Sequence, residues 1–216
     1  MSDGRLVAII PVGTLEGAKS RLGAVLDAEE RRDLVARMLS RTVEAALAVS
    51  RIAETIVISP DPDALAIAAG AGARTMRQRT QGLNQALRVA RDDALAGGAT
   101  ALLVLPIDLP LVSAAALADL VAVLDGGGSG GKDDAEDALV ALVPDRHGRG
   151  TNALLLRPPD AIEFAFGGDS RKAHAAAAAA GGASFRELDS PLSVDLDTPD
   201  DLLLVERLAS DAVHGH

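Results

Sequence analysis

Thr100-Ala-Leu-Leu-Val-Leu105, followed directly by Pro106-Ile-Asp-Leu-Pro110, is the stretch that decides the fold of this chain of 216 residues. Its first six residues form the clearest strand in the sequence, an apolar run bounded by turn residues. The two prolines end this strand, because proline cannot donate a hydrogen bond to a neighbouring strand. Asp108 therefore lies at the carboxyl end of a buried strand.

Outward from this strand, short apolar runs alternate with helical patterns. Further strands are predicted at residues 7–11, 55–59, 73–76, 138–143, 152–156 and 184–188. Helices are predicted at residues 27–49, 62–70, 82–95, 113–124 and 171–180, the last of these capped by Asp169 or Ser170, and a final helix starts at Thr198. This alternation, with one late hairpin, predicts an α/β fold: a three-layer α/β/α Rossmann-like sandwich around a mostly parallel mixed sheet.

Residues 1–210 are predicted to form one domain, since the chain is long enough for a single large core. Residues 125–137 are acidic and rich in glycine, and we expect a flexible surface loop there. A domain linker is the alternative, and the sequence does not decide whether the loop acts as a lid or a tether. Residues 211–216 are expected to be a disordered tail.

The composition excludes several classes of function. A net charge of −10 and only three aromatic residues argue against nucleic-acid binding. The absence of cysteine excludes disulfides and thiolate nucleophiles, and with four histidines any metal should be bound by oxygen, as Mg²⁺ rather than zinc. No apolar run is long enough to span a membrane and the first residues lack a signal peptide, so a cytoplasmic protein is expected. The sequence leaves open whether it forms a homodimer.

Ligands in open α/β sheets bind beyond the carboxyl ends of the strands. After the first strand, Gly13 and Gly17 precede Lys19 and Arg21 in a loop without the Walker order. Backbone N–H groups near the glycines and the two cations suit a polyphosphate, and a solvated basic loop is the alternative. Gly82-Leu83-Asn84 offers a helix N-terminus for an anion or an amide for a base edge, or it is only a capping pattern.

Three acids are the candidate metal ligands. Asp108 follows the strongest strand, and Asp195 and Asp197 alternate along an extended segment and so face the same side. Two carboxylates on one side repel each other unless a cation lies between them. The alternatives are a turn-forming role for Asp108 and a helix-starting role for Asp197 beside Thr198.

Two turns rich in small residues suit an anionic ligand. Gly150-Thr151-Asn152 begins an apolar strand, and Phe166-Gly167-Gly168-Asp169-Ser170 forms a second turn. Hydroxyl groups and unobstructed backbone N–H groups offer donors without steric bulk. Two ordinary turns are the alternative explanation.

The chain resembles the CofC/FbiD family, guanylyltransferases of coenzyme F420 biosynthesis. The matching residues, in the family's order, are Ile9-Ile10-Pro11, Ala18-Lys19-Ser20-Arg21-Leu22, Gly82-Leu83-Asn84 with Ala86-Leu87, Asp108-Leu109-Pro110, Gly150-Thr151-Asn152, Phe166-Gly167-Gly168-Asp169-Ser170 and Asp195-Leu196-Asp197-Thr198-Pro199. The resemblance implies a fold of the nucleotide-diphospho-sugar transferase (GT-A-like) type. It also implies Mg²⁺-dependent transfer of GMP from GTP to the phosphate of phosphoenolpyruvate or 2-phospho-L-lactate, with release of pyrophosphate.

The resemblance also implies roles for residues. Catalysis would involve Lys19, Arg21 and Asp108, and Mg²⁺ would be held by Asp108, Asp195 and Asp197. The nucleotide would contact Pro11, Gly13, Lys19, Gly82 and Asn84. Phosphoenolpyruvate would contact Thr151, Gly167 and Ser170. One departure is Gly13, where many family members have lysine. The alternatives are another nucleotidyltransferase of this fold, acting on a sugar phosphate or a molybdenum cofactor, and a non-catalytic nucleotide-binding module. The sequence does not separate phosphoenolpyruvate from 2-phospho-L-lactate or 3-phosphoglycerate.

Overall fold

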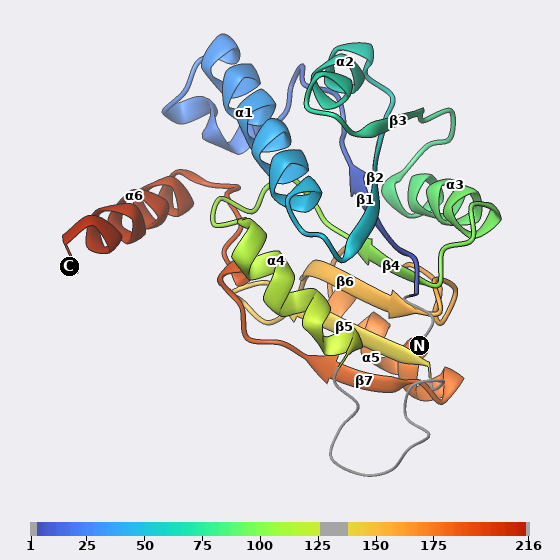
Figure 1. Cartoon of the computed structure of the whole chain (residues 1–216). Helices are drawn as coiled ribbons and strands as arrows, with labels where there is room; N and C mark the ends of the chain where they lie inside the picture. The colour runs from blue at the N-terminus through green and yellow to red at the C-terminus, as the bar shows by residue number, and fades with distance from the viewer. Residues whose placement is uncertain (1–3, 126–137, 215–216) are drawn as a thin grey trace.

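A computed structural model describes residues 4–125 and 138–214 of the chain (Figure 1). Within these ranges the strands are β1 (Leu6–Pro11), β2 (Ile52–Ser59), β3 (Arg74–Arg77), β4 (Ala101–Val104), β5 (Leu139–Pro144), β6 (Thr151–Arg157) and β7 (Ser184–Glu187). The helices are α1 (Ala28–Leu47), α2 (Pro62–Gly70), α3 (Leu83–Ala96), α4 (Ala114–Val121), α5 (Ser170–Gly181) and α6 (Pro199–His214), with short 3-10 turns η1 (Ser20–Ala24), η2 (Ala122–Leu124) and η3 (Pro191–Ser193).

The strands form one mixed sheet in the order β3-β2-β1-β4-β6-β5-β7. The pairs β1–β2, β1–β4, β2–β3 and β5–β7 are parallel, whereas β6 runs antiparallel to both of its neighbours, β4 and β5. The first residue of β6, Thr151, therefore lies at the same edge as the carboxyl ends of β1 and β4. The predicted sheet and its late hairpin are confirmed.

Helices cover both faces of the sheet. Leu6, Ala8 and Ile10 of β1 pack with buried residues of α1, α2 and α4, while Val7 and Ile9 pack with those of α3 and α5. This alternation follows from the two-residue repeat of a strand, with apolar side chains on both faces because both are buried. Figure 1 shows α4 in front of the sheet and α5 behind it. The predicted three-layer α/β/α sandwich is confirmed.

Some boundaries differ from those predicted. The loop after β1 includes the 3-10 turn η1, and β2 begins at Ile52 rather than at residue 55. Asp169 occupies the N-cap position of α5, but with φ 55° its side chain makes no capping hydrogen bond, and Ser170 is the first helical residue. Asp169 therefore takes the N-cap position, as one of the two predicted alternatives, but its side chain does not cap the helix.

The structure describes part of the predicted tail at 211–216 and one residue of the predicted loop at 125–137. Helix α6 continues to His214, so residues 211–214, expected in a disordered tail, are helical, because neither proline nor glycine interrupts the chain before Gly215. Of the predicted loop at 125–137, Asp125 forms a turn and the other residues lie outside the described ranges. The strands on both sides of it join the same sheet. No helix in the described residues has the length and apolar character needed to cross a membrane.

Candidate active site

A cavity of about 570 Å³ opens at the carboxyl ends of β1 and β4. The loop after β1, the start of α3 and the turn after β4 form its walls. Five of the predicted site residues line it: Pro11, Gly13, Lys19, Gly82 and Asp108. The remaining lining residues are largely aliphatic or small, which suits a base bound by backbone groups in a chain that has only three aromatic residues.

The loop after β1 is held in place from the neighbouring strand connection. Asp61, the N-cap of α2, accepts hydrogen bonds from the backbone N–H of Leu15 (2.8 Å) and of Asp63 (2.9 Å). These bonds, that of Leu15 most of all, lower the pKa of Asp61. Further along the loop, Gly17 and Lys19 both have positive φ angles, of 73° and 51°. The loop therefore folds back, which places the Lys19 ammonium over the sheet edge.

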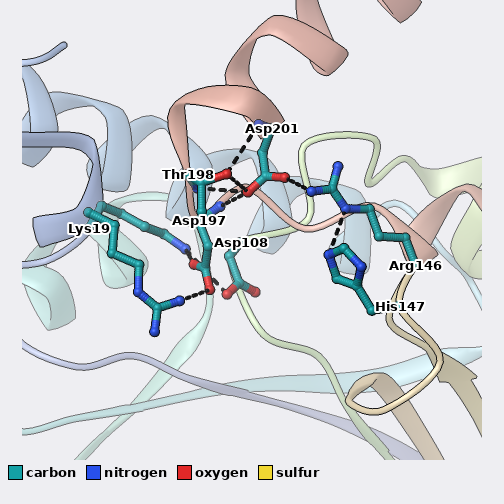
Figure 2. A network of polar contacts seen from close by, with 8 residues as sticks. Lys19, Asp108, Arg146, His147, Asp197, Thr198 and Asp201 are labelled. Atoms are coloured by element: carbon teal, nitrogen blue, oxygen red, sulfur yellow. Dashed lines mark hydrogen bonds and ion pairs between the residues drawn. The ribbon is translucent and has the colours of Figure 1, made fainter. Parts of the chain in front are cut away.

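Lys19 joins two of the predicted acids (Figure 2). Its Nζ lies 2.6 Å from Asp197 Oδ1 and 3.3 Å from Asp108 Oδ2, and its side chain is only 11% exposed. Burial by itself lowers the pKa of Lys19, but the charge of Asp108 and the hydrogen bond to Asp197 outweigh it and raise the pKa above 10.5. Arg21 lies farther out, 75% exposed and 4.0 Å from Asp197. Lys19 is therefore a fixed cation at the end of the cavity.

The segment that carries Asp195 and Asp197 is fixed to the turn after β4. The backbone N–H of Leu196 donates to the carbonyl oxygen of Asp108 (2.9 Å). Asp195 shares this environment, because burial and then the charges of Asp108 and Asp197 raise its pKa. The structure thus brings the three predicted acids into one electrostatic neighbourhood.

The three acids do not form a ready metal cage. In the described part of the chain, no group of three or more histidine or acidic side chains is arranged to hold a metal ion. The ammonium of Lys19 occupies the place between Asp108 and Asp197 that a cation would take. The donor chemistry nevertheless fits Mg²⁺, which prefers a few carboxylate oxygens together with phosphate oxygens and water.

A second group of contacts fixes the start of α6 (Figure 2). Asp201 Oδ2 accepts hydrogen bonds from the backbone N–H of Asp197 (2.9 Å) and of Thr198 (2.7 Å) and from the Thr198 hydroxyl (2.8 Å). Its other oxygen forms an ion pair with Arg146, from the turn between β5 and β6. The buried Asp201 thereby links the segment of Asp197 to the hairpin that presents Thr151.

Thr151 and Asn152 point to different partners. The Thr151 hydroxyl oxygen lies 3.1 Å from His174 Nδ1 and accepts a hydrogen bond from Ser170 Oγ (3.2 Å). The Asn152 amide donates to the carbonyl oxygens of Leu192 (2.9 Å) and Ser193 (3.0 Å). Thr151 thus belongs to a buried hydroxyl pair, whereas Asn152 positions the chain that leads to Asp195.

Asn84 makes a different contact from the one expected. Its amide donates to the carbonyl oxygen of Phe166 (3.0 Å) and accepts from the N–H of the same residue (2.9 Å). Gly82, with φ 84°, lines the cavity, whereas the Asn84 amide is engaged by the turn at 166–170. In this structure the Asn84 amide therefore positions Phe166 and the turn that contains Gly167, and its contact with guanine or ribose stays a prediction.

Sequence reasoning missed three residues of this site: Arg146, His174 and Asp201. The spacing Thr198-Pro-Asp-Asp201 is that of a helix capping box, with an acid three residues after the threonine, and could have identified Asp201. Ser170 and His174 are four residues apart and so share one face of α5, which was a weaker signal. No local pattern indicates Arg146, since its partner lies 55 residues further along the chain.

Known proteins of similar sequence belong to one family. The family model "Guanylyl transferase CofC like" matches residues 6–211. A phosphoenolpyruvate guanylyltransferase of Sphaerobacter thermophilus is 44% identical over 210 residues, covering 97% of this chain and 95% of the relative. A protein of the same name from Rubrobacter xylanophilus is 44% identical over 200 residues, covering 92% of each.

Solved structures with low sequence identity share the fold. One, described as a nucleotide-diphospho-sugar transferase from Desulfovibrio desulfuricans G20, has a TM-score of 0.73 at 17% identity and covers 96% of this chain and 88% of its own. Another, CMP:2-keto-3-deoxy-manno-octonic acid synthetase in complex with CTP, has a TM-score of 0.60 at 15% identity and covers 96% and 99%. The fold is thus of the nucleotide-diphospho-sugar transferase type, and by its sequence this chain belongs to the CofC-like guanylyl transferase family.

Proposed function

We propose that this protein transfers GMP from GTP to the phosphate of phosphoenolpyruvate and releases pyrophosphate, a step of coenzyme F420 biosynthesis. The observation that carries the proposal is the 44% identity, over nearly the full length of both chains, to relatives named phosphoenolpyruvate guanylyltransferase. The geometry supports it. A cavity ends at Lys19 and two carboxylates, and the Thr151–Ser170 hydroxyl pair belongs to the strand and helix that begin at the same edge of the sheet.

The proposed reaction needs no nucleophilic side chain from the protein, which suits a chain without cysteine. A phosphate oxygen of the acceptor attacks the α-phosphorus of GTP, the bond to the β-phosphate oxygen breaks, and pyrophosphate leaves. The acceptor phosphate is already an anion near neutral pH, so no general base is needed. Lys19 and Arg21 stabilise the negative charge that develops on the leaving pyrophosphate, and the walls of the cavity align the reactants.

We further propose that Asp108, Asp195 and Asp197 hold Mg²⁺. When bound, the ion polarises phosphate oxygens and offsets their charge. With an ion on these carboxylates, Asp108 and Asp197 would not depend on the Lys19 ammonium for neutralisation, and Lys19 would be available to the phosphates. Two observations support this proposal. The charges of Asp108 and Asp197 act on Asp195, and the backbone of Leu196 is bonded to Asp108, so the three carboxylates lie near one another. Carboxylate oxygens are also ligands that Mg²⁺ prefers.

Pyrophosphate release tests the reaction. Each nucleoside triphosphate is offered with Mg²⁺ and a panel of phosphoenolpyruvate, 2-phospho-L-lactate, 3-phosphoglycerate and several sugar phosphates. Release with GTP and phosphoenolpyruvate alone is expected. Release only with a sugar phosphate would keep the fold and contradict the acceptor, and binding of GTP without release from any mixture would indicate a nucleotide-binding module.

Asp108→Asn tests the metal ligands. We expect at least a 100-fold lower turnover in Mg²⁺, on the order of the loss seen when a charge-stabilising group is removed. Asp119→Asn changes an exposed acid on α4 and is the matched control, with normal turnover expected. Near-normal turnover of Asp108→Asn would show that Asp108 is not a metal ligand.

A further inference from the structure

A buried histidine lies behind the hydroxyl pair of the proposed acceptor site. His174 is fully buried on α5, one helical turn after Ser170, and Thr151 and Ser170 are 7% and 2% exposed. The resemblance to the family implies roles for Thr151 and Ser170 but none for His174. Its contacts determine how the two hydroxyl groups can orient their hydrogens.

The protonation of the ring follows from its contacts. The backbone N–H of Ala165 donates to His174 Nε2 (3.1 Å), and an amide nitrogen in this position can only donate. Nε2 is therefore the bare nitrogen. Burial lowers the pKa of His174 to about 4, so the ring is neutral near pH 7 and its single hydrogen is on Nδ1. The ring of Phe166 packs edge-on against the imidazole at 5.0 Å between centroids and fixes its plane.

This tautomer sets how many hydrogens are available for the hydrogen bonds among His174, Thr151 and Ser170. Nδ1–H donates to Thr151 Oγ1 at 3.1 Å, and the Ser170 and Thr151 hydroxyls share one further hydrogen bond at 3.2 Å. The three groups have three hydrogens, and these two bonds use two of them. Whichever hydroxyl donates within the pair, one hydroxyl hydrogen is left over. With the other tautomer, Thr151 would donate to Nδ1 and Ser170 to Thr151, and no hydrogen would remain.

We propose that His174 is a positioning residue of the acceptor site, whose Nδ1–H orients the Thr151–Ser170 pair so that one hydroxyl hydrogen is offered to the bound acceptor anion. This inference rests on the proposed function for the location of the acceptor. His174 itself does not contact the acceptor. It acts through Thr151, and its effect should appear in acceptor binding rather than in binding of the nucleotide.

The first test concerns the ring alone. Long-range ¹H–¹⁵N correlation spectra of the full chain labelled with ¹⁵N-histidine report which ring nitrogen carries the hydrogen, and His174→Gln identifies the His174 signals among the four histidines. The expected result is a protonated Nδ1 and a bare Nε2. A protonated Nε2 overturns the inference. This test uses neither GTP nor acceptor, so its outcome is independent of the proposed function.

The second test separates the two ring nitrogens. In His174→Asn the amide nitrogen replaces Nδ1 and can still donate to Thr151, whereas in His174→Gln the amide oxygen replaces Nε2 and only the contact to Ala165 is kept. The KM for phosphoenolpyruvate is expected to stay within about threefold of the wild-type value in the first variant and to rise about 10- to 100-fold in the second. The KM for GTP and kcat at saturating acceptor stay unchanged in both.

Equal changes in the two variants, or a matching rise in the KM for GTP, overturn the inference, because a structural role would affect both variants alike. If neither variant folds, the tautomer measured on the wild-type chain decides the inference: a hydrogen on Nδ1 supports it and a hydrogen on Nε2 overturns it. Wild-type protein that releases no pyrophosphate with any phospho-acid contradicts the proposed function instead, and the tautomer measurement then decides the inference.

Discussion

The backbone of Lys19 has φ 51° and ψ 41°, a left-handed conformation that costs an L-residue about 1–2 kcal/mol. Such strain persists where the surrounding structure compensates for it, and it is concentrated at functional sites. Here the compensation comes from the two carboxylates that Nζ reaches, Asp197 and Asp108. The conformation therefore serves the position of a charge.

Lys19→Met tests that charge, since methionine keeps an unbranched side chain and removes the ammonium. We expect kcat/KM for GTP to fall about 100- to 1000-fold, because the developing charge on pyrophosphate loses its buried counter-charge. The measurement is initial-rate pyrophosphate release. Lys172→Met, at an exposed position of α5, is the matched control with unchanged kcat/KM. Comparable losses in both variants would contradict the role of Lys19.

Gly13 offers the opposite test, the addition of a charge. Its φ is not positive, and a Cβ built there meets no heavy atom within 4 Å, so a side chain fits. Gly13→Lys is expected to lower the KM for GTP about three- to tenfold, since it adds a cation to the wall of the cavity. Gly13→Gln is the uncharged control. The difference between them should shrink at high salt, and a difference that salt leaves unchanged would not be electrostatic.

His174 also makes stability depend on pH. Its pKa is about 4 in the folded protein because burial disfavours the charged ring, against 6.5 when the chain is unfolded. Between these values the unfolded state binds more protons, so the free energy of unfolding falls as pH falls from 6.5 toward 4 and is constant with respect to this group above 6.5. Urea unfolding at pH 7 and pH 5 should show a larger loss for wild type than for His174→Asn. Equal losses would mean that His174 does not titrate in this way.

At the scale of elements, the N-terminus of α6 is the best-defined helix start at the site. Thr198 and Asp201 exchange hydrogen bonds across the first turn, and Arg146 pairs with the remaining oxygen of Asp201. Burial by itself raises the pKa of Asp201, but the N–H groups of Asp197 and Thr198 and the charge of Arg146 outweigh it, and the pKa is lowered. One carboxylate thus orients the segment that carries Asp197.

Asp201→Ala is expected to lower the free energy of unfolding by about 2–4 kcal/mol, because it removes a helix cap and leaves Arg146 without its buried partner. Pyrophosphate release should fall as well, since Asp197 loses its fixed position. Asp200→Ala is the control: Asp200 lies in the same first turn but is exposed, and its loss should change the stability by less than about 0.5 kcal/mol. Thermal and urea unfolding measure both variants, and equal stabilities would contradict the role of Asp201.

The two edges of the sheet illustrate what local sequence can and cannot predict. Strands β3 and β7 have four residues each, and both carry charged side chains, which protects the edges against pairing with other chains. Both were predicted from their apolar residues, to within one residue at their ends. Their place at the edges was not predictable, because strand order depends on pairings between distant segments.

At the scale of the whole molecule, periodicity predicted the layers and the edge at which the site lies. It did not predict which side chains meet there. Lys19 and Asp197 are 178 residues apart, and Asn84 and Phe166 are 82 apart. Such contacts depend on rotamers and strand order that no short window of sequence contains. The pairing of Asn84 with Phe166 was not predictable for this reason, whereas the position of Asp108 follows directly from the end of one strand.

The reversed direction of β6 has a consequence for how this protein can change. The turn at 145–150 lies at the sheet edge that carries the candidate site, yet it only joins two hydrogen-bonded neighbours, so no crossover helix depends on its length. Hairpin tips tolerate insertion and exchange well. Several contacts still limit such exchange. Arg146 pairs with Asp201, and the carbonyl oxygens of Gly148 and Arg149 accept hydrogen bonds from Arg171 of α5. A Cβ at residue 150 would lie 2.8 Å from Asp145 Oδ2, so the Asp145 side chain would have to shift. Where these contacts are kept, the turn can change in length and sequence between related proteins without moving the residues that line the cavity, since none of residues 145–150 lines it.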